Sequence, residues 1–207
     1  MLTILRTRTS GGFMLDSIDG ARLSYGSGAN ADSTLDGDAL TIGPNDTALC
    51  RRLVLAGGGE DKFLRTMPVS VFIQAPLRWW FDADAYKVGT VKQSSSLMHF
   101  MVRHGEFKPA HFTATTDSRL IAIANEKFAA WVAAGGRRNF KSVEWEELQD
   151  SIGRGYLYTA QWYASYAAVR NAFRQRRHHR QAEWRTFCAW ATTLPYADLL
   201  ITLERDK

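Results

Sequence analysis

The chain has 207 residues, of which 45% are hydrophobic, 23% charged and 12% aromatic, which is the composition of a folded globular protein with a sizeable core. No apolar run approaches the roughly 20 residues of a membrane-spanning helix, and the apolar stretch at the start is too short for a signal peptide, so we expect a cytoplasmic protein without a membrane partner. The formal net charge of +5 favours anionic partners, but a nucleotide and a nucleic acid are both compatible with it.

Hydrophobic periodicity and turn residues predict strands early in the chain and helices later. In chain order, strands are predicted at residues 1–10, 39–42 and 67–75. Helices are predicted at residues 18–25, from Asp46 as the N-cap to the glycines at 57–59, at 77–87, at 119–134, from Ser142 onward, and through much of 156–192. Strands followed by a helix-rich C-terminal third indicate a single α+β domain over residues 1–207.

A polar loop is predicted at residues 89–96, with the sequence Gly-Thr-Val-Lys-Gln-Ser-Ser-Ser. Its serines, Gln93 and Lys92 supply hydrogen-bond donors, and Gly89 lets the backbone approach a ligand closely. Such a loop could hold a phosphate, although a solvated turn is the more common role of this composition. The GxxxxGK[ST] spacing of a P-loop is absent.

Apolar residues in the last third recur at steps of three and four, which is typical of helices packed on a core. They are Trp162, Tyr166, Val169 and Phe173, and further on Trp184, Phe187 and Ala191. Between the two groups the same steps fall on Arg177 and Arg180. Either the helix breaks there and leaves a basic corner, or the arginines point inward, where a guanidinium needs an anion such as phosphate.

No metal site is predicted. His178 and His179 are adjacent, so on a helix they point about 100° apart and cannot share one metal ion in the usual i, i+4 manner. Cys50 and Cys188 are too few for a thiolate cluster and are expected to be free thiols. Trp79 and its neighbouring tryptophan could stack on a base or a flavin, but such a pair is more often part of the core.

Several short segments, each weak alone, occur in a distinctive order along the chain. They are Ala21-Arg22-Leu23-Ser24-Tyr25, Gly59-Glu60-Asp61-Lys62-Phe63-Leu64-Arg65, Phe72-Ile73-Gln74-Ala75-Pro76, Tyr86-Lys87-Val88 followed after seven residues by Ser96, and Val169-Arg170-Asn171 followed by Gln181-Ala182-Glu183. In this order the chain resembles the flavin-dependent thymidylate synthases (the ThyX family). It is also similar to uncharacterised phage-associated proteins that share a Trp-Trp…Tyr-Lys-Val-Gly-Thr…Ser…Met-His pattern.

The resemblance implies a central antiparallel sheet flanked by helices and a homotetramer whose sites lie between subunits. It implies the ligands FAD, dUMP and a folate. In this family NADPH reduces the flavin, and a methylene group from methylene-tetrahydrofolate becomes the C5 methyl group of the pyrimidine. The flavin carries the difficult chemistry, so neither cysteine of the chain is needed for methylation.

The resemblance also assigns roles to polar residues, although it identifies no catalytic residue. Those expected at the pyrimidine nucleotide are Gln93, Ser94 and Ser96, with Arg177 at its phosphate. Those expected at the flavin are Arg78, Lys87, Arg170 and Asn171. The chain departs from the family where Tyr86, Lys87 and Val88 replace two arginines and a histidine, where Glu60 replaces a turn histidine, and where Met98 replaces an arginine. Each lost guanidinium contact removes a charge-assisted hydrogen bond of about 1.5–3 kcal/mol.

Three functions therefore remain open. The first is a divergent flavin-dependent pyrimidine methyltransferase. The second is a protein that binds a pyrimidine nucleotide on the same scaffold without flavin. The third is a nucleic-acid-binding protein, which the net charge, seven tryptophans and the basic run at residues 174–180 would suit.

Overall fold

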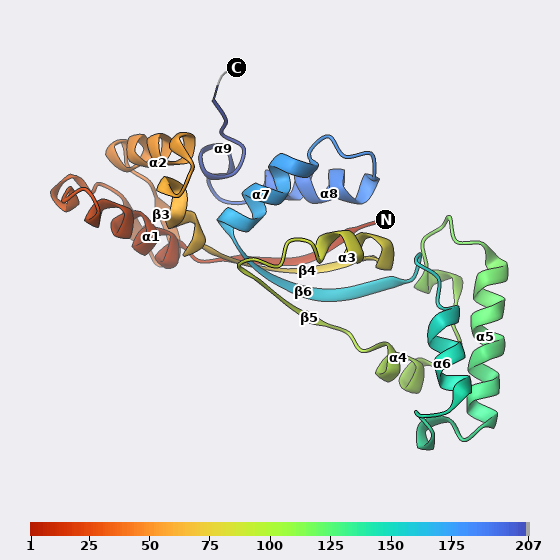
Figure 1. Cartoon of the computed structure of the whole chain (residues 1–207). Coiled ribbons are helices and arrows are strands. Elements are labelled where there is room, and N and C mark those ends of the chain that lie inside the picture. The colour runs from red at the N-terminus through yellow and green to blue at the C-terminus, as the bar shows by residue number, and fades with distance from the viewer. Residues whose placement is uncertain (206–207) are drawn as a thin grey trace. The chain divides into compact units, whose positions relative to one another are not determined.

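The main element is a four-stranded antiparallel sheet flanked by helices (Figure 1). The structure is a computed structural model that describes residues 1–205, apart from the side chains of Val102 and His104. In the order in which they pair, the strands are β1 (Thr3–Thr9), β4 (Pro68–Pro76), β6 (Leu157–Ser165) and β5 (Thr90–Ser94). A separate hairpin pairs β2 (Thr34–Asp36) with β3 (Ala39–Thr41). The predicted α+β class with its antiparallel sheet is confirmed.

Two strands of the four-stranded sheet differ from the sequence prediction, and β2 of the hairpin was not predicted either. Residues 156–192 were expected to be mostly helical, but β6 occupies their first part and buries alternate residues, among them Ala160 and Trp162. Residues 89–96 were expected to be a loop, but Thr90–Ser94 form β5 at an edge of the sheet, with side chains that are largely exposed. An edge strand needs no apolar face, so its composition resembles that of a loop.

The chain divides into two compact units. The larger comprises residues 2–73, 86–92 and 161–205. Its helices are α1 (Gly11–Leu23), α2 (Pro44–Ala56), α7 (Tyr166–Arg176), α8 (Ala182–Ala191) and α9 (Ala197–Leu200), with 3-10 turns at Gly28–Asn30 and Glu60–Arg65. The prediction of a single domain stays a prediction.

A buried ion pair ties α1 to α2. The Arg22 guanidinium donates to the Asp46 carboxylate, and the side chains of both residues are almost fully buried. Asp46 also accepts hydrogen bonds from the Ser33 hydroxyl and backbone N–H. The predicted N-cap role of Asp46 is wrong, because α2 begins at Pro44 after Gly43 and Asp46 lies in the first turn.

The basic corner of the last third is a helix break. α7 ends at Arg176 and α8 begins at Ala182, and the two helices pack against each other. The apolar residues on either side of the break are buried, including Val169, Phe173 and Phe187. Of the two alternatives predicted from the sequence, the chain therefore has the helix break and not one continuous helix.

The smaller unit comprises Gln74–Ala85 and Gln93–Ala160. Its helices are α3 (Leu77–Ala83), α4 (Leu97–His104), α5 (Ser118–Ala133) and α6 (Val143–Ser151), with 3-10 turns at Pro109–His111 and Gly136–Arg138. α5 and α6 pack against each other (Figure 1), and their core includes Trp131, Trp145 and Tyr156. Trp79 and Trp80 are 1% and 2% exposed, which supports the core role of this pair.

The helices do not have the form of membrane spans. Over residues 1–205, none is both long enough and apolar enough to cross a bilayer.

Candidate functional site

A basic cleft of about 780 Å³ lies in the larger unit, between α7, the end of α2 and the residues after α9. Its lining is Val54, Leu55, Ala56, Gly57, Gly58, Arg170, Asn171, Arg174, Gln175, Arg177, Glu204 and Arg205. We call it the arginine cleft, since its lining includes four arginines and one glutamate. It brings together three of the residues predicted from the sequence, Arg170, Asn171 and Arg177.

The regular spacing of α7 produces this basic face. Ser165 is the N-cap of the helix, and its hydroxyl accepts a hydrogen bond from the Ala168 N–H. Arg170, Arg174 and Arg177 follow at steps of four and three and so share one side of the helix. Gln175 donates to the side-chain oxygen of Asn171 at 2.9 Å. The helix thus presents guanidinium and amide groups to one cavity.

Arg170 organises the C-terminal segment. The residue is 5% exposed, and its Nη1 and Nη2 donate to the backbone oxygens of Ile201 and Leu203 at 2.8 and 2.7 Å. Burial, and then the nearby charge of Arg174, lower the pKa of the Arg170 guanidinium. Two of its nitrogens are already bonded within the protein, which fits a positioning role.

Arg177 and Arg174 share one carboxylate. Arg177 Nη2 lies 2.7 Å from Glu204 Oε2, and Arg174 Nε lies 3.5 Å from Glu204 Oε1. The hydrogen bond from Arg177 lowers the pKa of Glu204, so this carboxylate is ionised at neutral pH. Arg177 Nε is buried and has no hydrogen-bond partner among the described residues. These arginines therefore hold an anion.

A turn of glycines forms the opposite wall. Gly57, Gly58 and Gly59 have φ values of +61°, +60° and +104°, which residues with a side chain rarely adopt. A backbone of this kind can present N–H groups to an anion. The Arg205 Nε donates to the Leu55 oxygen at 2.8 Å and ties the C-terminal segment to the same wall.

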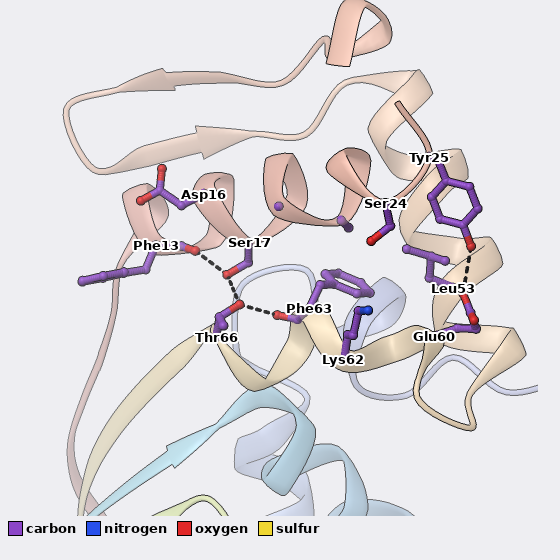
Figure 2. A pocket seen from close by; sticks show the side chains of 12 residues that line it. Phe13, Asp16, Ser17, Ser24, Tyr25, Leu53, Glu60, Lys62, Phe63 and Thr66 are labelled. Carbon is purple, nitrogen blue, oxygen red and sulfur yellow. Dashed lines mark hydrogen bonds between the residues drawn. The ribbon is translucent and has the colours of Figure 1, made fainter. Parts of the chain in front are cut away.

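A second cavity, of about 600 Å³, lies between α1 and the 3-10 turn Glu60–Arg65. Figure 2 shows the side chains that line it. Its lining is Phe13, Asp16, Ser17, Gly20, Ala21, Ser24, Tyr25, Leu53, Glu60, Lys62, Phe63 and Thr66. We call it the apolar pocket, because Phe13, Leu53 and Phe63 supply much of its surface. Sequence reasoning missed it. The signal would have been the small residues Ser17, Gly20 and Ala21 on one face of α1, with Ser24 at its C-cap, since small side chains leave space beside a helix.

Hydrogen bonds within the protein join polar residues that line the apolar pocket, in two groups (Figure 2). In the first group Tyr25 donates to Glu60 at 2.8 Å, and this bond raises the pKa of the Tyr25 phenol. In the second group the Ser17 hydroxyl donates to the Phe13 oxygen at 2.6 Å, and Thr66 Oγ1 lies 2.8 Å from both Ser17 Oγ and the Phe63 oxygen. The pocket thus offers mainly apolar surface.

The other predicted nucleotide residues lie in the smaller unit. Gln93 and Ser94 are exposed residues of β5. Ser96 caps α4, and its hydroxyl accepts a hydrogen bond from the His99 N–H at 3.2 Å. Arg78 is half-buried in the first turn of α3, in the same unit. A role of these residues in ligand binding stays a prediction.

Residues 86–88 stand where the ThyX family has two arginines and a histidine. Tyr86 lies in the protein core, whereas Lys87 and Val88 lie on the surface. Tyr86 is 8% exposed, and its hydroxyl lies 2.8 Å from Arg176 Nε, which donates to it, and 3.1 Å from Gln175 Oε1, which accepts from it. Its ring packs edge-on against Trp184. Lys87 is exposed and Val88 is 93% exposed. The segment contributes one cation, Lys87.

No group of three or more His, Cys, Asp or Glu residues suited to a metal ion was found among the described residues.

Comparison with known proteins adds information on the fold. No protein-family model and no curated protein sequence matches the chain. A solved structure of thymidylate synthase X (ThyX) from Helicobacter pylori with FAD and dUMP is similar, with 11% sequence identity, a TM-score of 0.61, and coverage of 97% of this chain and 96% of that chain. The UMP/dUMP methylase PolB from Streptomyces cacaoi, bound to 5-Br dUMP, is similar with 15% identity, a TM-score of 0.63, and coverage of 96% and 90%. The chain therefore has the fold of these flavin-dependent and nucleotide-methylating enzymes, whereas an association with phages stays a prediction.

Proposed function

We propose that the chain binds a pyrimidine deoxynucleotide of the dUMP type, with the phosphate of the nucleotide in the arginine cleft. The observation that carries the proposal is the face of α7 on which Arg174 and Arg177 hold the Glu204 carboxylate. Guanidinium groups that hold a carboxylate suit phosphate as well, because both anions accept parallel hydrogen bonds. The dUMP and 5-Br dUMP in the similar structures support this choice of ligand.

Each polar residue of the cleft has a proposed role. Arg177 and Arg174 bind the phosphate, and Arg170 holds the wall of the cleft through the backbone oxygens that it contacts. Asn171 and Gln175 offer amide groups to the sugar or the base. Gln93, Ser94 and Ser96 remain proposed nucleotide contacts, each to be tested by itself.

The flavin fits this chain less well than the nucleotide. Two arginines and a histidine would grip a pyrophosphate, but Tyr86 is bonded within the core and Val88 has no polar side chain. Lys87 is a cation of the wrong shape for a bidentate grip. Arg78, Lys87, Arg170 and Asn171 remain the proposed contacts of a flavin, if the chain binds one; without flavin, Arg170 and Asn171 have only the roles in the arginine cleft given above. We derive no reaction step through FAD.

A second candidate function is methylation of the nucleotide at C5 with FAD, NADPH and methylene-tetrahydrofolate. The ThyX and UMP/dUMP methylase structures favour it, because they share the fold across nearly the whole chain. A homotetramer belongs to the same proposal.

Calorimetry with dUMP tests the nucleotide proposal. We expect the wild-type chain to bind dUMP and to bind deoxyuridine, which lacks the phosphate, much more weakly. Arg177→Ala should weaken dUMP binding about 10- to 100-fold, the effect of losing about 1.5–3 kcal/mol of charge-assisted hydrogen bonding. Arg119→Ala is the matched control, since Arg119 is also paired with a carboxylate but lies on the exposed surface of the smaller unit.

Either of two results would contradict the nucleotide proposal. One is an unchanged dUMP affinity in Arg177→Ala. The other is the absence of dUMP binding. If the chain then binds DNA of any sequence with strong salt dependence, a nucleic-acid-binding protein is favoured.

The absorbance spectrum of the protein after incubation with FAD and desalting separates the two candidate functions. Because the signature segment lacks its arginines, we expect the near-ultraviolet and blue bands of the flavin to disappear on desalting. Bands that remain at one flavin per chain would favour the methylation function, and an assay for transfer of a methyl group to dUMP would then follow. A flavin-binding control such as a known thymidylate synthase of this fold should keep its bands.

A further inference from the structure

Glu204 lines the arginine cleft, and its carboxylate is paired there with Arg174 and Arg177. We propose that Glu204 is an internal competitor, which lies where the phosphate of the ligand binds and which the ligand displaces. This inference rests on the proposed function, because it concerns the same cleft and the same anionic ligand.

The contacts of Glu204 are those that a phosphate would make. Its Oε2 lies 2.7 Å from Arg177 Nη2, and its Oε1 lies 3.5 Å from Arg174 Nε. One anion thus bridges two guanidinium groups, as a bound phosphate does. The Glu204 side chain is 30% exposed, so water and a dissolved anion can reach the pair.

The backbone on both sides of Glu204 is held in place. Before it, the oxygens of Ile201 and Leu203 accept hydrogen bonds from Arg170. After it, Arg205 donates to the Leu55 oxygen at 2.8 Å. Release of the carboxylate therefore needs only rotation of the Glu204 side chain about its own bonds, a change of ordinary rotamers.

In the absence of a ligand, the negative charge of Glu204 offsets the repulsion among the arginines of the cleft. Without an anion, the arginines on one face of α7 repel one another, and Arg174 is one cause of the lowered pKa of Arg170. Glu204 supplies one negative charge, whereas a phosphate monoester at neutral pH carries between one and two. A phosphate ester can therefore displace the carboxylate, but an uncharged nucleoside or a simple carboxylate gains little by doing so. Glu204 accordingly favours dianionic ligands.

Calorimetry on Glu204→Gln tests the competitor, with dUMP and inorganic phosphate as probes. The amide keeps the shape of the side chain but loses the charge, so we expect both probes to bind about two- to tenfold more tightly than in the wild type. Glu147→Gln is the matched control. Glu147 is also paired with a cation, Lys127 at 2.9 Å, and lies in the smaller unit. Glu147→Gln removes one negative charge from the chain, as Glu204→Gln does, and should leave both affinities unchanged.

The combined variant Arg177→Ala with Glu204→Gln provides an internal check. If Glu204 competes for Arg177, then Glu204→Gln should tighten binding much less when Arg177 is absent.

The outcomes separate this inference from the function on which it rests. Equal or weaker binding by Glu204→Gln, with normal binding by the wild type, overturns the competitor and leaves nucleotide binding intact. Equal tightening by Glu147→Gln also overturns it, since the gain would then come from net charge alone. Absence of binding of both probes to every variant overturns the proposed function itself.

Discussion

The arginines of α7 differ in what their guanidinium groups already contact. Arg170 is buried and bonded to two backbone oxygens, so removing it would loosen the C-terminal segment as well as change the charge of the cleft. Arg177 is one-third exposed and bonded to the side chain of Glu204 rather than to the backbone. Substitutions of Arg170 therefore cannot report cleanly on ligand binding, whereas substitutions of Arg177 can.

Asp46 should control the acid stability of the larger unit. Burial favours the protonated form of its carboxyl group, but the hydrogen bonds from Ser33, the Asp32 N–H and Arg22 outweigh burial and lower its pKa below the ordinary value. Because the pKa is lower in the folded chain, Asp46 stabilises the fold above the pKa of the unfolded chain, and this contribution is lost as the pH falls through the folded value.

The substitution Asp46→Asn tests this assignment. It leaves the buried Arg22 without its counter-ion, so we expect the free energy of unfolding at neutral pH to fall by about 3–5 kcal/mol. Denaturant titrations at several pH values should show that this difference shrinks in acid. Glu147→Gln, which breaks an exposed pair, should change little, and an equal loss in both variants would contradict the special role of the buried pair.

At the scale of elements, the errors of sequence reasoning come from a sheet whose strands are not equally buried. β4 alternates buried and half-buried residues, and its period of two was recognised from the sequence. β5 is exposed along most of its length, so it carries no apolar period. β6 contains Trp162 and is followed directly by Tyr166 of α7, so its apolar residues were read as the start of the helical pattern.

Replacing a glycine by alanine should stabilise a helix but destabilise a left-handed turn. Gly20 in α1 and Gly26 just after it allow a direct test. A Cβ added at Gly20 of α1 or at Gly26 would meet no atom within 4 Å. Gly20→Ala should stabilise the fold by about 0.5–1 kcal/mol through helix propensity. Gly26 has φ +59°, so Gly26→Ala should destabilise it by about 1–2 kcal/mol. Thermal unfolding measures both, and shifts of the same sign would contradict the argument.

At the scale of the whole molecule, the fold could be predicted because the order of motifs along the chain reflects the order of elements. The arginine face could be predicted in part, since Arg170, Asn171 and Arg177 lie within one helix and its C-cap. Glu204 and the glycine turn at 57–58 could not, because only packing of the distant segments brings them to α7. The apolar pocket likewise depends on how far α1 lies from the turn at residues 60–65.

The direct junction between β6 and α7 constrains how the gene can change. Ser165 is the last residue of the strand, and Tyr166 is the first of the helix, so no loop can absorb an added or lost residue. Each residue of a helix turns it by about 100°, whereas each residue of a strand turns its side chain to the other face. One inserted codon in β6 would therefore either expose Trp162 or swing the arginines away from their cleft. Insertions and deletions should be tolerated in the hairpin at 34–41 long before they are tolerated here.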